Sequence, residues 1–169
     1  MKVQRIFLGL ALVLMACTVR AGIPDIELRD LDGKPRNVNE FIGHGKWTIV
    51  SIWAHNCSVC EKEIGEMAAF HTANRDRGAM VLGVSIDGME QMDLARKFVA
   101  RHTLPFVNLV AEPEQDMIAK FGGGAFIGTP THYFYDPTGR IVGRKIGPMP
   151  RADLEAFIDA FNKSAHAIH

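Results

Sequence analysis

The sequence predicts an α/β protein built around one mixed sheet, with helices on both faces. Residues 48–53 and 80–86 are β-branched or otherwise apolar runs, which are typical of buried central strands. The segment between them is long enough for a crossover helix, so we expect these two strands to be parallel. Residues 131–135 and 141–146 flank the turn sequence Asp-Pro-Thr-Gly at 136–139, which predicts an antiparallel hairpin.

The other elements follow from apolar periodicity and turn residues. We expect residues 89–102 to form a helix with Leu94, Phe98 and Val99 on its apolar side. The expected elements are, in chain order, a hairpin over 26–38, a helix over 58–75, a helix over 89–102, a strand over 106–110, a helix over 114–121 and a closing helix around 154–161.

Residues 1–21 have the features of an export signal. A positively charged start precedes an eleven-residue apolar run over 6–16, and 19–21 offers a small-residue cleavage site. The run is too short for a bilayer, which needs about 20 residues. The sequence Leu-Met-Ala-Cys at 14–17 resembles a bacterial lipobox that would place a lipid on Cys17, although its methionine is atypical. Cleavage to a soluble form, lipidation and an uncleaved anchor stay open, and each places the domain outside the cytoplasm, where disulfides persist.

We expect one domain over residues 24–162 and a short tail over 163–169. The chain of 169 residues is long enough for one full hydrophobic core. Without the export segment it has 16 basic and 19 acidic residues. This balance provides no electrostatic footprint for nucleic acid, so we expect no nucleic-acid partner.

Cys57 and Cys60 are the only cysteines after the export segment. A disulfide between them closes too short a loop to be an effective structural crosslink. Their spacing instead puts a second thiol within reach of any mixed disulfide, as thiol–disulfide exchange requires. Cys57 stands where a strand passes into a helix, and a helix N-terminus lowers a thiol pKa from about 8.5 to about 3.5–7.5. We therefore assign nucleophilic attack to Cys57 and resolution to Cys60, one turn inside the helix.

The segment Trp-Ala-His-Asn-Cys-Ser-Val-Cys at 53–60 resembles the active-site segment of thioredoxin-fold proteins. Thr129-Pro130, just before the strand at 131–135, resembles their cis-proline loop. In that family the cis-proline packs beside the nucleophilic sulfur and the preceding backbone pairs with an extended substrate. The resemblance therefore implies substrate binding at Thr129 and Pro130. Trp53 packs under the motif in relatives, and we group it with this binding region in a structural role.

The resemblance narrows to the TlpA/ResA/DsbE-like exported branch. Seventy positions separate Cys60 from Pro130, which leaves room for an inserted helix and strand within about 87–110. This insertion, the N-terminal hairpin and the export signal fit that branch over residues 24–162. The resemblance implies a periplasmic or lipid-attached protein-disulfide oxidoreductase. It favours a reductase, one candidate task being the preparation of apocytochrome c thiols for haem, and a membrane electron donor for re-reduction. The sequence has no nucleotide, haem or flavin signature, so we expect the cysteine pair to carry the chemistry without a further cofactor.

Three features depart from the family pattern. Ser51 stands where thioredoxin carries a buried aspartate, Asn56 stands where an aromatic residue is common, and no proline lies between the cysteines. The missing aspartate removes a proton acceptor for Cys60. Glu63, at i+3 from Cys60, would replace it and matches a glutamate of ResA-like relatives. The alternative for Glu63 is a solvated helix carboxylate.

Two histidines lie near the motif in sequence or in the expected sheet. A protonated His55 would favour the Cys57 thiolate. His132 is two residues after Pro130 and so shares a sheet face with it. The alternatives are a surface histidine at 55 and a hydrogen-bonded sheet histidine at 132.

Metal and peroxide chemistry are the competing functions. Two cysteines and a nearby histidine would suit copper, as in thioredoxin-fold copper chaperones, but those typically separate their cysteines by three residues rather than two. A closed zinc site would need two more ligands, and the sequence has no second Cys-x-x-Cys and no His-x-x-x-His. Peroxiredoxins of similar fold carry a Pro-x-x-x-Thr-x-x-Cys segment, which is not matched here. We expect no metal site and keep copper delivery as the alternative function.

Overall fold

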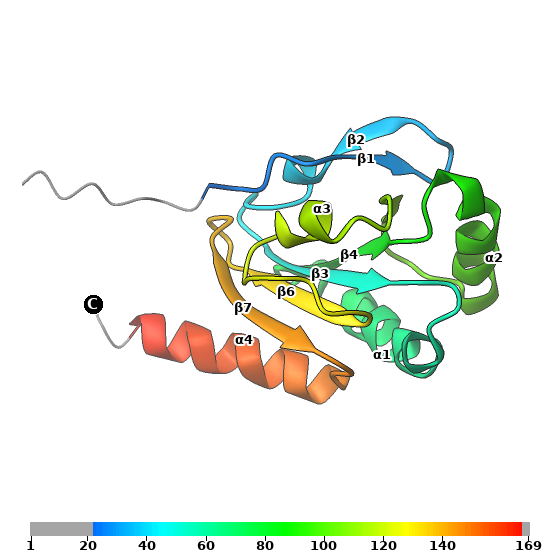
Figure 1. Ribbon diagram of the computed structural model, residues 1–169. Helices are drawn as coiled ribbons and strands as arrows, with labels where there is room; N and C mark the ends of the chain where they lie inside the picture. Colours follow the sequence, from blue (N-terminus) through cyan, green and yellow to red (C-terminus); the bar gives the residue numbers. More distant parts are fainter. Residues whose placement is uncertain (1–21, 167–169) are drawn as a thin grey trace, which may run out of the picture.

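The computed structural model describes residues 22–166, which form a seven-stranded mixed sheet with helices on both faces (Figure 1). The strand order is β2-β1-β5-β4-β3-β6-β7. The strands are β1 (Glu27–Asp30), β2 (Pro35–Asn37), β3 (Trp47–Trp53), β4 (Ala79–Ser85), β5 (Asn108–Val110), β6 (Thr131–Tyr135) and β7 (Ile141–Ile146). The α-helices are α1 (Ser58–Asn74), α2 (Met92–His102), α3 (Gln115–Ala119) and α4 (Arg151–His166), and the short 3-10 helices are η1 (Val38–Glu40) and η2 (Met89–Gln91).

The central strand β3 explains why the sheet has two apolar faces. It pairs in parallel with β4 and antiparallel with β6, and all seven of its residues are buried. Because side chains alternate along a strand, Ile49 and Trp53 enter one apolar cluster whereas Val50 and Ile52 enter the other. Ser51 lies between Ile49 and Trp53 on the first face.

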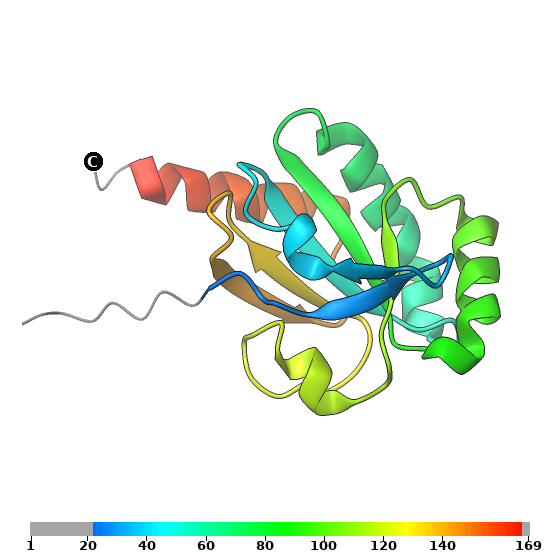
Figure 2. The ribbon, with the colours of Figure 1, turned by 90° about the horizontal axis from the view of Figure 1, so that it is seen from above.

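Different helices cover the two faces of the sheet. Met67 of α1, Phe98 of α2 and Leu154 of α4 belong to the cluster on one face. Val38 of η1 and Ile118 of α3 belong to the cluster on the other. Figures 1 and 2 show α1 and α4 on the opposite side of the sheet from α3. This arrangement confirms the expected α/β fold class, with its mixed sheet between two helical layers.

The expected insertion is the segment that contains η2, α2 and β5. Strand β5 pairs in parallel with β4 on one side and antiparallel with β1 on the other. The N-terminal hairpin of β1 and β2 is therefore joined to the sheet through β5. Both additions to the central fold are present where the sequence predicts them.

Two details differ from the sequence predictions. The apolar side of α2 is formed by Met92, Ala95 and Phe98, whereas Leu94 is 38% exposed. The prediction was wrong for Leu94 because the buried stripe runs through i, i+3 and i+6, which leaves Leu94 at its edge. The closing helix α4 extends to His166 and so includes part of the segment expected to be a tail over 163–169.

The expectations for residues 1–21, including a lipid on Cys17, lie outside the described residues. Within residues 22–166, each helix is too short or too polar to cross a membrane.

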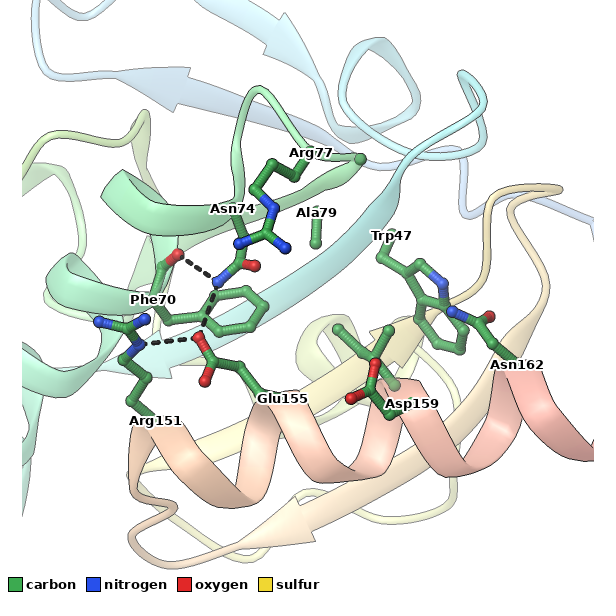
Figure 3. A pocket seen from close by; sticks show the side chains of 11 residues that line it. Trp47, Phe70, Asn74, Arg77, Ala79, Arg151, Glu155, Asp159 and Asn162 are labelled. Atoms are coloured by element: carbon green, nitrogen blue, oxygen red, sulfur yellow. Dashed lines mark hydrogen bonds and ion pairs between the residues drawn. The ribbon is translucent and has the colours of Figure 1, made fainter.

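A polar hollow between α1 and α4 shows how the closing helix is attached (Figure 3). Asn74, the last residue of α1, donates hydrogen bonds to the Phe70 carbonyl and to Glu155 Oε1, both at 3.0 Å. Arg151 Nε also donates to Glu155 Oε1, at 2.7 Å. These bonds, first of all the one from Arg151, lower the pKa of Glu155. The hollow is at the opposite end of α1 from Cys57, and its central polar groups bond to one another, which indicates a structural role.

Candidate active site

Cys57 is the N-cap residue of α1, directly after the turn that follows β3. Its Sγ accepts a hydrogen bond from the backbone amide of Cys60 at 3.1 Å, and the two cysteines are joined by a disulfide. An N-cap side chain meets the unpaired amides and the positive end of the helix dipole. Cys57 is half-buried, whereas Cys60 is only 2% exposed. This difference agrees with the expected division into an attacking and a resolving cysteine.

Pro130 of the Thr129–Pro130 loop lies near Cys60. Its peptide bond is cis, the geometry implied by the resemblance, and Pro130 lines the same small cavity as Cys60. The loop is held on both sides: Thr131 Oγ1 donates to the Gly128 carbonyl at 2.6 Å, and the Gly147 amide donates to the Pro130 carbonyl at 2.9 Å. Thr129 is half-buried and precedes the buried proline, so the loop can present backbone at the surface.

Trp53 supports the site from below and has no exposed surface. Its ring stacks on Phe98 with the ring centroids 4.5 Å apart, and its Nε1 donates to Asn108 Oδ1 at 3.1 Å. These contacts agree with the structural role expected of Trp53, and its place among the substrate-binding residues stays a prediction.

Glu63 is buried, which excludes the alternative of a solvated helix carboxylate. It faces the sheet because it follows Cys60 by one helical turn. Its Oε1 lies 2.8 Å from His132 Nε2 and accepts the Met149 backbone amide at 3.0 Å. Glu63, His132, Cys60 and Pro130 line one small cavity under the disulfide. The structure thus places the proposed proton acceptor and the resolving cysteine around the same small gap in the packing.

His132 lies on β6 with its Cα directly across from that of Ser51 on β3. Both are fully buried, at 0% and 1% exposed, and both line the cavity under Cys60. The prediction that His132 shares a sheet face with Pro130 is confirmed, since both residues line this cavity. A serine at position 51 is small enough to leave room beside it for the imidazole.

Asp87, which the sequence analysis did not identify, fixes the loop in front of Cys57. Its carboxylate lies 2.7 Å from His55 Nδ1 and accepts the His55 backbone amide at 3.1 Å. The Ser85 hydroxyl also donates to Asp87, which is only 7% exposed. One signal was available: Asp87 follows β4, and the carboxyl ends of parallel strands meet at the edge where ligands bind. His55 is therefore a partly buried, paired side chain rather than a free surface histidine.

The arrangement supplies the groups that dithiol–disulfide exchange needs: an accessible sulfur at a helix N-terminus, a buried second sulfur and an adjacent carboxylate. For metal binding, residues 22–166 contain no group of three or more cysteine, histidine or acidic side chains placed to hold an ion.

Comparisons with known proteins agree with this geometry. The sequence matches the AhpC/TSA family over residues 19–144. Thiol-disulfide oxidoreductase ResA of Bacillus thuringiensis (strain Al Hakam) is 26% identical over 136 residues, which cover 80% of this chain and 73% of that protein. Thiol:disulfide interchange protein HelX of Rhodobacter capsulatus is 26% identical over 136 residues, which cover 80% of this chain and 72% of that protein.

Solved structures give the same result. The crystal structure of a thiol:disulfide interchange protein of the thioredoxin family from Chlorobium tepidum TLS superposes with a TM-score of 0.68 and 25% identity, covering 81% of this chain and 92% of that one. These relatives are named as thiol-disulfide oxidoreductases or interchange proteins, and the AhpC/TSA family match covers most of the chain. The chain therefore belongs to the AhpC/TSA family, as a thiol-disulfide oxidoreductase with a thioredoxin-like fold.

Proposed function

We propose that this protein is an exported reductase of protein disulfides that works through the Cys57–Cys60 pair. The observation that carries the proposal is the unequal setting of the two sulfurs. Cys57 is partly exposed at the start of α1, where the Cys60 amide bonds to its sulfur, whereas Cys60 is 2% exposed. A helix N-terminus stabilises a thiolate, and the thiolate is the species that attacks a disulfide.

The reaction has two steps. The Cys57 thiolate attacks one sulfur of a substrate disulfide and releases the other as a thiolate, which leaves a mixed disulfide on Cys57. Cys60 then gives up its proton to Glu63 and attacks Cys57 Sγ, which releases the second substrate sulfur. The substrate gains two electrons and the Cys57–Cys60 disulfide forms. The Thr129–Pro130 loop holds the substrate backbone during both steps.

The pair supplies the two electrons itself, so no further cofactor is required. A membrane electron donor then restores the dithiol. The expected export signal at residues 1–21 supports action in the periplasm, either free or attached through a lipid on Cys17. Disulfides of apocytochrome c, whose reduction yields the thiols for haem attachment, are the substrate class that we favour, because the chain resembles the ResA- and DsbE-like branch. A nucleic-acid partner is not part of the proposal.

The central experiment measures reduction of insulin by the dithiol form, with the Cys57→Ser variant as the matched inactive control. The proposal expects turnover by the wild type only. In a cell extract, Cys60→Ser should retain substrates as mixed disulfides, whereas Cys57→Ser should retain none. Equal trapping by both variants would contradict the assigned roles.

The direction of electron flow is tested by equilibration with glutathione. A reductase should have a reduction potential near that of thioredoxin, about −270 mV. A potential near that of the oxidant DsbA, about −120 mV, would reverse the proposed direction.

A further inference from the structure

Glu63 of α1 and His132 of β6 form a buried acid–imidazole pair under the disulfide, which is an ion pair when the imidazole is protonated. Glu63 Oε1 and His132 Nε2 are 2.8 Å apart, and the two side chains are only 5% and 1% exposed. A buried ion pair is weak evidence for stability, because removing two charged groups from water costs several kcal/mol for each ion. β6 is already fixed in the sheet by its pairing with β3 and β7. The pair therefore calls for an explanation other than holding the fold together.

The pair is incompletely hydrogen bonded. Glu63 Oε1 accepts the Met149 amide, but in the described part of the chain Glu63 Oε2 and both ring nitrogens of His132 have no hydrogen-bond partner. The ring approaches the carboxylate closely without being aligned with it. Most buried polar groups in proteins are bonded, and exceptions often have a catalytic or redox role. These unbonded atoms leave the pair able to accept and release a proton.

Cys60 lines the same site as the two side chains that carry these unbonded atoms. Cys60, Glu63 and His132 line one small cavity, together with Ser51 and Pro130. Ser51 is the residue across from His132 on β3. Cys60 itself is 2% exposed, so a proton that leaves its thiol must pass to a group inside the protein.

We propose that His132 is a positioning residue for the resolving step, which stabilises the Glu63 carboxylate in place so that it takes the proton of Cys60. The inference rests on the proposed reaction of Cys57 and Cys60. A lone carboxylate in this cavity would lack a compensating charge, and burial disfavours the charged form of an acid. The adjacent imidazole supplies that compensation.

The S–H bond of Cys60 breaks and its proton passes to Glu63. The Cys60 sulfur bonds to Cys57 Sγ, and the bond between Cys57 and the substrate sulfur breaks. The substrate sulfur leaves as a thiolate with the bonding electron pair, and the proton returns to solvent after product release.

The groups that face the pair come from three elements and from the loop before α4. Cys60 comes from α1, and Lys145 of β7 lies across from His132 but is exposed. Ser51 of β3 and the backbone amide of Met149 are also near, and neither titrates in the range tested. Cys60 is therefore the buried titratable partner of the pair.

The test separates the two chemical steps with a small aromatic disulfide, dithiobis-nitrobenzoate, and the full dithiol protein. Attack by Cys57 releases one coloured thiolate, and resolution by Cys60 releases the second, so stopped-flow absorbance records two phases. At pH 7 we expect Glu63→Gln and His132→Leu each to slow the second phase about tenfold or more, while the first phase changes less than about twofold. The difference in second-phase rate between the variants and the wild type should disappear near pH 9, because Cys60 then loses its proton without an acceptor.

Two further variants control for a structural effect. His71→Gln replaces a second buried histidine, which lies on α1 rather than on β6, and should leave both phases unchanged. The double variant Glu63→Gln/His132→Leu removes both charges together and should be no slower than the slower single variant, because residues that act as a unit are not additive. Thermal unfolding checks that each variant is folded, and the double variant provides the decisive measurement if His132→Leu alone is unstable.

Several results would overturn the proposal. The first two are equal slowing of both phases in the variants and a second phase that is still slower than in the wild type at pH 9. The others are a double variant in which the two effects on the second phase add, and a second phase of normal rate in folded His132→Leu. Failure of the proposed function looks different, because a protein that shows both phases with dithiobis-nitrobenzoate but never reduces insulin retains the thiol chemistry and lacks the substrate.

Discussion

The imidazole Nδ1 of His55 lies 2.7 Å from Asp87 Oδ1, which joins the loop before Cys57 to the end of β4. The same carboxylate accepts the His55 backbone amide and the Ser85 hydroxyl. Asp87 thus connects the loop that carries the attacking cysteine to a strand that lies in the middle of the sheet. The position of Cys57 depends on this connection as well as on the start of α1.

The Asp87→Asn variant tests this dependence. Because an amide cannot accept all three bonds as a carboxylate does, we expect a loss of about 1–3 kcal/mol in the free energy of unfolding. We also expect slower attack of Cys57 on small disulfides. Denaturant unfolding and stopped-flow kinetics measure the two effects. Asp93→Asn, at an exposed aspartate paired with Arg96, is the control and should change neither quantity.

The two cysteines should differ in alkylation. In the dithiol form at pH 7, iodoacetamide should modify Cys57 at least about tenfold faster than Cys60, since only Cys57 is both accessible and placed at the helix N-terminus. Mass spectrometry of digests at successive times measures both rates. In denaturant the two rates should become equal. Preferential modification of Cys60 in the folded protein would reverse the proposed roles.

A substitution at Gly83 tests the hydrogen bond between Trp53 and Asn108 beneath the Cys57–Cys60 motif. A Cβ at this position would lie 2.0 Å from Asn108 Oδ1, the atom that accepts the Trp53 indole N–H. Gly83→Ala should therefore displace Asn108, break that bond and cost about 2–4 kcal/mol in the free energy of unfolding.

Gly65→Ala is the matched control, since nothing lies within 4 Å of its added Cβ on the exposed side of α1. Alanine is the better helix former, so this variant should be about 0.5–1 kcal/mol more stable than the wild type. Guanidinium unfolding measures both variants. A Gly83→Ala protein as stable as the wild type would show that Asn108 moves without cost.

His71 gives a prediction for the pH dependence of stability. Burial, with a contribution from Arg75, lowers the pKa of His71, and its Nδ1 accepts the Val81 amide at 3.1 Å. That amide needs a partner because β5 begins to pair with β4 only at Gly83. The folded protein therefore prefers neutral His71, whereas the unfolded chain binds a proton below about pH 6.5. This contribution is fully present above that pH and is lost as the pH falls toward the lower folded pKa.

His71→Leu should cost about 1–3 kcal/mol at pH 8, because the Val81 amide loses its partner. The difference in the free energy of unfolding between wild type and variant should shrink as the pH falls from 7 to 5. Urea unfolding across this range measures it. A difference that is constant with pH would mean that His71 does not titrate with folding.

The attacking cysteine could be predicted from the sequence because its environment is local. A buried strand, a Cys-x-x-Cys motif and a helix follow one another directly, so the N-cap position of Cys57 depends on neighbouring residues only. The pairing of Glu63 with His132 could not be predicted in this way. Those residues are far apart in the chain, and their contact depends on the register of β6 against β3 and on how α1 lies across the sheet.

Asp87 and Leu94 illustrate the same limit. Apolar periodicity located β4 and α2, but periodicity does not specify which polar residue past a strand turns back to bond a loop. Nor does it define the edge of a buried stripe closely enough to place Leu94 outside it.

β5 lies between β1 and β4 in the sheet, and this position limits which segments the chain could lose during evolution. The β1–β2 ribbon pairs with the rest of the sheet through two residue pairs, Arg29 with Val110 and Asp30 with Leu109. A descendant that lost α2 and β5 would leave that ribbon with no strand to dock on. The β1–β2 hairpin and the insertion with α2 and β5 should therefore be gained or lost together. We expect no homologue that keeps the hairpin but lacks β5.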